Sequence, residues 1–185
     1  MRRRTTISQN PQLERDHFPR IMIYDLHQDD PTKCTAARLE RLRLAQPIHS
    51  PRQIPRAAIV LNPTATKTIS SEDRAMINDH GLVGLDCSWN TADAVFGENI
   101  KGENRRLPTL LAGNPTNYSI RGRLSTAEAL AAALLITGYK ERAEEILGLF
   151  KWGKTFLALN QESLKEYAKA SPLEMFDRER EFFPE

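Results

Sequence analysis

A carboxylate, a thiol, a hydroxyl and an indole follow one another at Asp86-Cys87-Ser88-Trp89, directly after the apolar run Leu82–Leu85. Such a run predicts a buried strand, and open α/β sheets bind ligands beyond the carboxyl ends of their strands. Asp86 could accept hydrogen bonds from a ribose or an amine or act as a base, and the face of Trp89 would attract a cation such as a sulfonium. The alternatives are that Asp86 caps a following helix and that Trp89 is a core aromatic. We interpret Cys87 as a small buried apolar residue.

Two further segments combine a predicted strand end with a helix start. Asp30–Thr35 precedes a predicted helix and offers backbone N–H groups and a hydroxyl to an anionic group, with simple helix capping as the alternative. Leu107–Gly138 predicts a strand, a turn-rich loop and a helix, whose start is marked by the capping-box pair Ser125 and Glu128. The positive end of such a helix suits a polar or anionic small molecule, although an ordinary βα unit has the same pattern.

The elements that position these segments alternate between strands and helices. Near-continuous apolar runs predict strands at 21–26, 57–61, 82–85 and 107–112. Helices are predicted at 35–45, 70–80 and 90–96, and beyond them at 125–137, 139–150 and about 155–170. This order is typical of a parallel sheet with helices on both faces, followed by an all-helical part. We therefore predict a basic flexible arm at 1–19, an α/β domain at 20–113 and a helical domain at 114–185.

The length and composition of the chain exclude several classes of protein. With 40% apolar and 27% charged residues, the 185-residue chain has a globular composition. No apolar stretch approaches the ~20 residues of a membrane-spanning helix, and no hydrophobic segment follows the first arginines as in a secretory signal. Two cysteines are too few for a disulfide framework, so a cytoplasmic location is expected. The four histidines lack metal-ligand spacing, so no metal is expected; a Cys–His nucleophile pair stays open without a local signature.

Basic residues gather in three places although the net charge is only +2: Arg2–Arg4, Lys33–Arg56, and Lys101–Arg106 together with Arg121 and Arg123. Acidic residues concentrate elsewhere in the chain. This separation predicts one basic face, as in proteins that bind the phosphate backbone of RNA, whereas solvated surface charge is the alternative. The candidate RNA contacts are Lys33, Arg38, Arg41, Arg105, Arg106 and Arg123.

Several of these segments together match one family. Asp30-Pro31-x-Lys33-Cys34-Thr35, Leu85–Trp89, Arg105–Pro108, Leu110–Asn117 and Leu124–Ala129 occur in the order and spacing of that family. In them the chain resembles the small-subunit ribosomal RNA aminocarboxypropyltransferases, ribosome-biogenesis proteins of archaea and eukaryotes. The resemblance covers about residues 20–169, and the short length resembles an archaeal member.

The resemblance implies an activity and a fold. Members use S-adenosylmethionine (SAM) but transfer its 3-amino-3-carboxypropyl group to nitrogen 3 of a pseudouridine, often one already methylated at nitrogen 1. Their fold is similar to that of knotted, SPOUT-like methyltransferases, with a deep trefoil knot that holds the cofactor. Relatives suggest a monomer that works on small-subunit RNA or a pre-ribosomal particle. The alternatives are a knotted RNA methyltransferase and a non-catalytic ribosome-assembly protein that binds RNA.

The resemblance also implies site residues. Leu61, Pro63 and Trp89 would line the cofactor, and Thr35 and Thr126 would hold its amino-acid end. The adenosine would lie along Leu85, Leu110, Tyr118, Leu124 and Ser125, partly through backbone groups. Asp86 is the candidate catalytic residue, as a base or as a polar orienting group. Ser119 and Thr32 depart from the family pattern, because glycine and a basic residue are common there.

Overall fold

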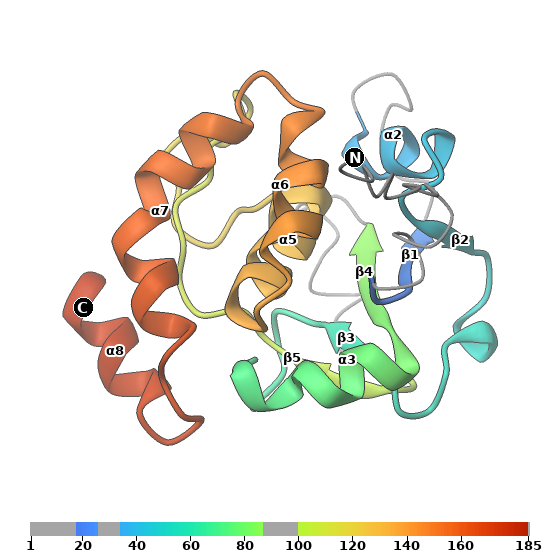
Figure 1. Cartoon of the computed structure of the whole chain (residues 1–185), viewed down its shortest axis with the longest axis horizontal. Helices are drawn as coiled ribbons and strands as arrows, with labels where there is room; N and C mark the ends of the chain where they lie inside the picture. Colours follow the sequence, from blue (N-terminus) through green and yellow to red (C-terminus); the bar gives the residue numbers. More distant parts are fainter. Residues whose placement is uncertain (1–17, 26–33, 87–99, 185) are drawn as a thin grey trace, which may run out of the picture.

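Five parallel strands form the sheet at the centre of the protein. The computed structural model describes residues 18–25, 34–86 and 100–184. The strands are β1 Ile21–Asp25, β2 Gln46–Ile48, β3 Ile59–Leu61, β4 Leu82–Asp86 and β5 Glu103–Arg105, in the order β2-β1-β4-β3-β5 (Figure 1). β4 pairs with β1 in the register Ile21↔Leu82 to Asp25↔Asp86. Asp25 and Asp86 therefore end neighbouring strands at the same edge, and the prediction of a parallel sheet is confirmed.

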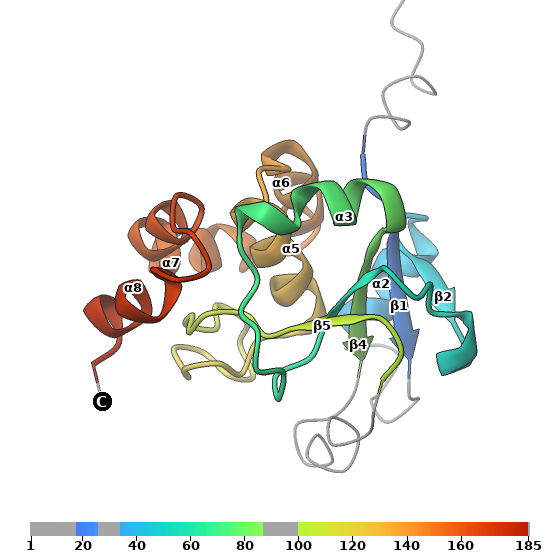
Figure 2. The same cartoon turned by 90° about the horizontal axis from the view of Figure 1, so that it is seen from below.

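The helices mostly follow the sheet in the sequence. They are α2 Thr35–Arg41, α3 Arg74–His80, α5 Thr126–Ile136, α6 Lys140–Gly148, α7 Gly153–Tyr167 and α8 Met175–Phe182. Two 3₁₀ turns, η1 Pro51–Gln53 and η2 Ser71–Asp73, lie between the strands. Figure 2 shows α5 and α6 between the sheet and the outer pair α7 and α8. No helix in the described ranges is long and apolar enough to cross a membrane.

The two faces of the sheet are covered differently. Alternate residues such as Ile21, Ile23 and Leu82 pack with α2, α3 and α5 in one large core cluster. Val60, Val83 and Leu85 face the other way, where the described partners include Ile54 and Ile100, which lie outside regular helices. The part of the chain that the structure describes thus has helices on one face. The helix predicted at 90–96 lies outside the described residues.

Helix α5 is the buried centre of the fold. It packs against β4, α2, α6 and α7, and its alanines allow this close approach on several sides. A Cβ on Gly84 would lie 3.3 Å from the side chains of Leu130 and Thr126, so β4 and α5 are in direct contact. Residues on both sides of position 113 contribute to the same core cluster. The predicted α/β and helical domains therefore share one hydrophobic core.

The prediction of a strand at 107–112 is wrong. The fifth strand is β5, a few residues earlier, while the segment after it makes only isolated bridges in the described structure, at Thr68↔Arg106 and Leu111↔Arg121. Leu110 and Ala112 are buried in the large core cluster, and their backbone groups bond to the loop that follows. Asn160 of α7 replaces a partner strand, because its side chain accepts from the Leu111 N–H and donates to the Leu111 carbonyl, both at 2.8 Å. Three short elements, β2, β5 and α8, were not predicted at all.

Candidate functional site

Asp86 lies at the carboxyl end of β4, where three elements meet. Thr126, the first residue of α5, donates its hydroxyl hydrogen bond to Oδ1 of Asp86. Cys34, the N-cap of α2, donates from its thiol to Oδ2 at 3.0 Å. The carboxylate is nearly inaccessible to solvent. Asp86 therefore joins the central strand to the starts of two helices.

Cys34 and Thr35 complete this junction from the side of α2. The Cys34 sulfur also accepts from the Ala37 N–H at 3.4 Å, so Cys34 is the residue that caps the helix. Burial, together with the neighbouring Asp86, raises the pKa of the Cys34 thiol to about 12. The thiol is therefore protonated at neutral pH and acts as a donor, not as a nucleophile. Thr35 accepts from the Ala127 N–H at 3.2 Å and so connects α2 to α5.

Glu128 is a fully buried carboxylate that closes the loop before α5. Its Oε1 accepts from the N–H groups of Gly113 and Asn114, at 2.7 and 3.0 Å. Its Oε2 accepts from the Asn114 amide and from both the N–H and the hydroxyl of Ser125, each at 2.7 Å. The capping box predicted for Ser125 and Glu128 is confirmed. The second task of Glu128, holding the far end of the loop, was missed because Gly113 and Asn114 come together with it only in the fold.

The loop between Asn114 and Ser125 has a defined backbone. Asn117 donates its N–H to the Asn114 side chain, and Ser119 donates to the Ala112 carbonyl at 2.7 Å. Ser119 has a φ of 63°, in the left-handed region that glycine adopts most readily. Glycine would adopt this conformation without a steric penalty, and serine adopts it here.

The predicted cofactor residues fall into three groups. Thr35, Leu85, Ser125 and Thr126 lie in or beside the junction at Asp86. Leu61, Leu110 and Leu124 are buried in the adjacent core cluster, so their side chains are largely covered by protein. Pro63 and Tyr118 are exposed, and Trp89 lies outside the described residues.

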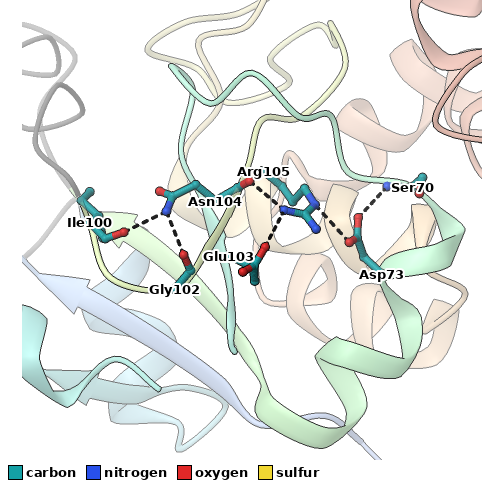
Figure 3. A network of polar contacts seen from close by, with 7 residues as sticks. All are labelled: Ser70, Asp73, Ile100, Gly102, Glu103, Asn104 and Arg105. Carbon is teal, nitrogen blue, oxygen red and sulfur yellow. Dashed lines mark hydrogen bonds and ion pairs between the residues drawn. The ribbon is translucent and has the colours of Figure 1, made fainter. Parts of the chain in front are cut away.

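Two of the predicted RNA contacts have a structural partner instead. Figure 3 shows the Arg105 guanidinium between Asp73, at 3.0 Å, and Glu103, at 3.4 Å, with Arg105 itself buried. Arg106 forms a double hydrogen bond with Glu179 of α8, at 3.1 and 2.9 Å. Although burial opposes it, hydrogen bonds from Arg106 and Thr109 lower the pKa of Glu179 below its ordinary value. These placements argue against a direct RNA contact by either arginine.

The other basic candidates are accessible. Arg38, Arg41 and Arg123 are exposed, and Lys33 lies outside the described residues. The Arg38 guanidinium lies over the Phe150 ring, 5.4 Å from its centre, so the first turns of α2 also contact the turn between α6 and α7.

Together these features define a parallel α/β protein with a candidate small-molecule site at the carboxyl edge of its sheet. A family model described as "Ribosome biogenesis protein, C-terminal" matches residues 59–183. A protein from Vulcanisaeta distributa named 16S rRNA aminocarboxypropyltransferase is 45% identical to this chain, covering 82% of it and 83% of the relative. One of the same name from Methanopyrus kandleri is 44% identical, covering 89% and 99%. The chain belongs to this family of ribosome-biogenesis aminocarboxypropyltransferases.

A solved structure agrees with this assignment. The SAM-dependent rRNA:acp-transferase Tsr3 from Vulcanisaeta distributa superposes with a TM-score of 0.82 at 43% identity, covering 89% of this chain and 88% of that chain. The parallel five-stranded sheet with its helices is therefore the fold of that enzyme.

A second family model, "Possible Fer4-like domain in RNase L inhibitor, RLI", matches residues 19–53. An iron–sulfur cluster is held by several cysteine thiolates, typically four. The chain has two cysteines in total, and Cys34 is the one within residues 19–53. Its thiol is also held protonated by burial and by Asp86. The residues present do not fit such a cluster.

Proposed function

We propose that this protein transfers the 3-amino-3-carboxypropyl group of SAM to nitrogen 3 of a pseudouridine, or N1-methylpseudouridine, in small-subunit ribosomal RNA. The names of relatives that are 44–45% identical over most of their length support the reaction class. The observation that carries the proposal to this chain is the junction of Asp86, Thr126, Cys34 and Thr35 at the carboxyl edge of the sheet.

The hydroxyl groups of this junction suit the amino-acid end of SAM. The Thr126 hydroxyl donates its hydrogen bond to Asp86, so its oxygen can accept a hydrogen bond from an ammonium group. Thr35 accepts from the Ala127 N–H, so its own O–H can donate to a carboxylate. The positive end of α5, an eleven-residue helix, favours the same carboxylate. Thr126 therefore offers an acceptor for the ammonium group of SAM, and Thr35 offers a donor for its carboxylate.

The rest of the cofactor would lie along neighbouring residues. We assign the adenosine to Leu85, Leu110, Leu124 and Ser125 and to the backbone of Tyr118, and the region around the sulfonium to Leu61, Pro63 and Trp89. SAM would supply a carbon that the adjacent sulfonium makes electrophilic. Attack by nitrogen 3 would form the N–C bond and break the C–S bond, leaving a neutral thioether, and the nitrogen-3 proton would pass to solvent. The contribution of the chain is to bind and orient that carbon toward the RNA.

Asp86 acts in this proposal as an orienting group. Both of its oxygens already accept hydrogen bonds, from Thr126 and from Cys34. The carboxylate is nearly inaccessible to solvent and holds the Thr126 hydroxyl in one orientation, and these placements favour an orienting role over general-base catalysis.

The finer architecture is also part of the proposal. We assign the deep trefoil knot to the passage of residues 107–125 before α5, with the helical part completing the cofactor pocket. The hydrogen bonds of Glu128 to Gly113, Asn114 and Ser125 support this assignment, because they fix both ends of the loop in the second half of the passage to one helix. The protein would act as a cytoplasmic monomer without a metal. RNA contacts are assigned to Lys33, Arg38, Arg41 and Arg123.

The test uses SAM labelled in one sample in the methyl carbon and in another in the carboxypropyl carbons. Each is incubated with the protein and small-subunit RNA, and the label in the RNA is counted. Carboxypropyl label without methyl label is the expected result. Methyl label would instead indicate a knotted methyltransferase, and tight RNA binding without transfer would indicate an assembly protein.

A further inference from the structure

Two large apolar side chains protrude from the loop that leads into α5. Tyr118 is 58% exposed and Ile120 is 45% exposed, with one residue between them. Neither side chain contributes to the two core clusters. Paired exposed apolar groups on a short segment are more typical of a contact surface than of a solvent-facing loop.

The backbone holds these side chains outward in one conformation. Asn117 is bonded to Asn114, and the Ile120 N–H donates to the Asn117 carbonyl at 2.9 Å. The left-handed residues Ser119 and Gly122, with φ of 63° and 71°, turn the chain on either side of Ile120. Gly122 also donates to the Leu110 carbonyl at 2.9 Å. Because the loop is already ordered, binding of a partner costs little backbone conformational entropy.

The charge of the loop selects the kind of partner. Residues 117–123 contain Arg121 and Arg123, both exposed, and no carboxylate. Arg121 is held in place by the C-terminal residues, with its guanidinium 5.4 Å from the centre of the Phe183 ring and 3.3 Å from the Pro184 carbonyl. An exposed aromatic ring beside two arginines is the combination that binds single-stranded RNA, in which unpaired bases stack and phosphates pair with the arginines.

The loop is tied directly to the candidate site. Asn114 at its start and Ser125 at its end both bond to Glu128, and the next residue, Thr126, bonds to Asp86. We propose that residues 117–123 form an RNA-docking loop, in which Tyr118 stacks on an unpaired base beside the modified nucleotide and Arg121 and Arg123 bind flanking phosphates. This inference rests on the proposed function, since it names how the RNA substrate is held. The backbone of Tyr118 stays available to the adenosine.

The test compares Tyr118→Ala with Tyr118→Trp and with Phe176→Ala. Phe176 is a matched control because it is 57% exposed and lies on α8, outside the loop. For each full-length variant, the dissociation constants for SAM and for a small-subunit RNA fragment are measured separately. Because stacking on an aromatic ring contributes about 1–3 kcal/mol per base, Tyr118→Ala is expected to weaken RNA binding about tenfold or more. SAM affinity should not change, and Tyr118→Trp and Phe176→Ala should bind RNA like the wild type.

The outcomes separate this inference from the proposed function. RNA affinity unchanged by Tyr118→Ala overturns the docking loop, even when the wild type transfers carboxypropyl label. A parallel loss of SAM affinity also overturns it and assigns the side chain to the cofactor. Selective loss of RNA affinity supports the docking loop even if the wild type transfers no label, in which case the proposed function alone fails.

Discussion

At the scale of single residues, the site depends on which atom of each polar side chain donates. Thr126 and Cys34 donate to Asp86, while Thr35 accepts from Ala127. Residue types alone leave these directions open, because hydroxyls and thiols can both donate and accept. In the proposed function, these directions give Asp86 an orienting role and make Thr126 an acceptor and Thr35 a donor for SAM.

Thr126→Val tests whether the Thr126 hydroxyl oxygen accepts a hydrogen bond from the ammonium group of SAM. The variant keeps the shape of the side chain but removes both the hydrogen bond to Asp86 and the acceptor for an ammonium group. Since a hydrogen bond to a charged group contributes about 1.5–3 kcal/mol, SAM binding should weaken at least tenfold in calorimetry. Thr126→Ser, which keeps the hydroxyl, is the control. Equal SAM affinity for Thr126→Val and the wild type would remove Thr126 from the site.

Cys34 predicts a pH dependence of stability. The pKa of its thiol is about 12 in the folded protein, against an ordinary value of 9.0. Between these values the unfolded chain has lost the proton and the folded one has kept it, so stability is fully present below pH 9 and falls as the pH rises. Urea unfolding at pH 8 and pH 10 should show this decline, and Cys34→Ala should show less of it. An identical decline in the variant would contradict the shift.

At the scale of elements, the segment after β5 is held by side chains of α7 and α8 and by backbone hydrogen bonds to the loop that follows it. Asn160 bonds to both backbone groups of Leu111, and Glu179 accepts from the N–H of Thr109 at 2.8 Å. An apolar run such as Leu107–Ala112 resembles a buried strand because it is buried and extended. Its partners are helices and the loop that follows it, and sequence periodicity does not reveal these partners.

Asn160→Ala tests this arrangement. It leaves the N–H and the carbonyl of Leu111 without their partner in the interior, at about 1–3 kcal/mol for each unsatisfied group. Chemical unfolding should show a loss of at least 2 kcal/mol, whereas Asn78→Ala, at an exposed asparagine of α3, should change stability by less than about 0.5 kcal/mol. Similar stabilities of the two variants would contradict the role of Asn160.

Ser119 gives a test of the loop conformation. Because an L-residue in the left-handed region costs roughly 1–2 kcal/mol, part of which glycine avoids, Ser119→Gly should stabilise the fold by up to about 1 kcal/mol. Ser119→Val, with a β-branched side chain, should destabilise it. Thermal unfolding of both variants provides the measurement. A valine variant as stable as the glycine variant would contradict the positive φ.

At the scale of the whole molecule, the basic residues divide into a structural and an accessible set. Arg105 and Arg106 pair with Asp73 and Glu179, whereas Arg38, Arg41 and Arg123 are exposed. Removing one partner of a buried ion pair typically costs about 3–5 kcal/mol. Arg105→Met should therefore lower the melting temperature strongly.

Arg41→Ala should behave in the opposite way. It should leave the melting temperature unchanged, weaken RNA binding, and reduce the salt dependence of that binding by about 0.7 for the lost phosphate contact. RNA affinity measured over a series of salt concentrations checks this. An unchanged salt dependence would remove α2 from the RNA surface.

Much of this organisation could be predicted from the sequence, but not all of it. The apolar runs at Ile21, Ile59 and Leu82 predict the central strands, and the Ser125–Glu128 pair predicts the start of α5. The burial of Arg105 and the second task of Glu128 depend on residues 32 and 15 positions away. Such pairings leave no local pattern, so basic character alone was a poor guide to RNA contact.

The central claim is that Asp86 and its neighbours form the site of aminocarboxypropyl transfer. The most direct measurement is transfer of carboxypropyl label from SAM to small-subunit RNA by the wild type, Asp86→Asn and Phe176→Ala, each first checked for folding. The account predicts transfer by the wild type and Phe176→Ala and a loss of at least tenfold with Asp86→Asn. Methyl label in the RNA, or equal transfer by a folded Asp86→Asn, would contradict it.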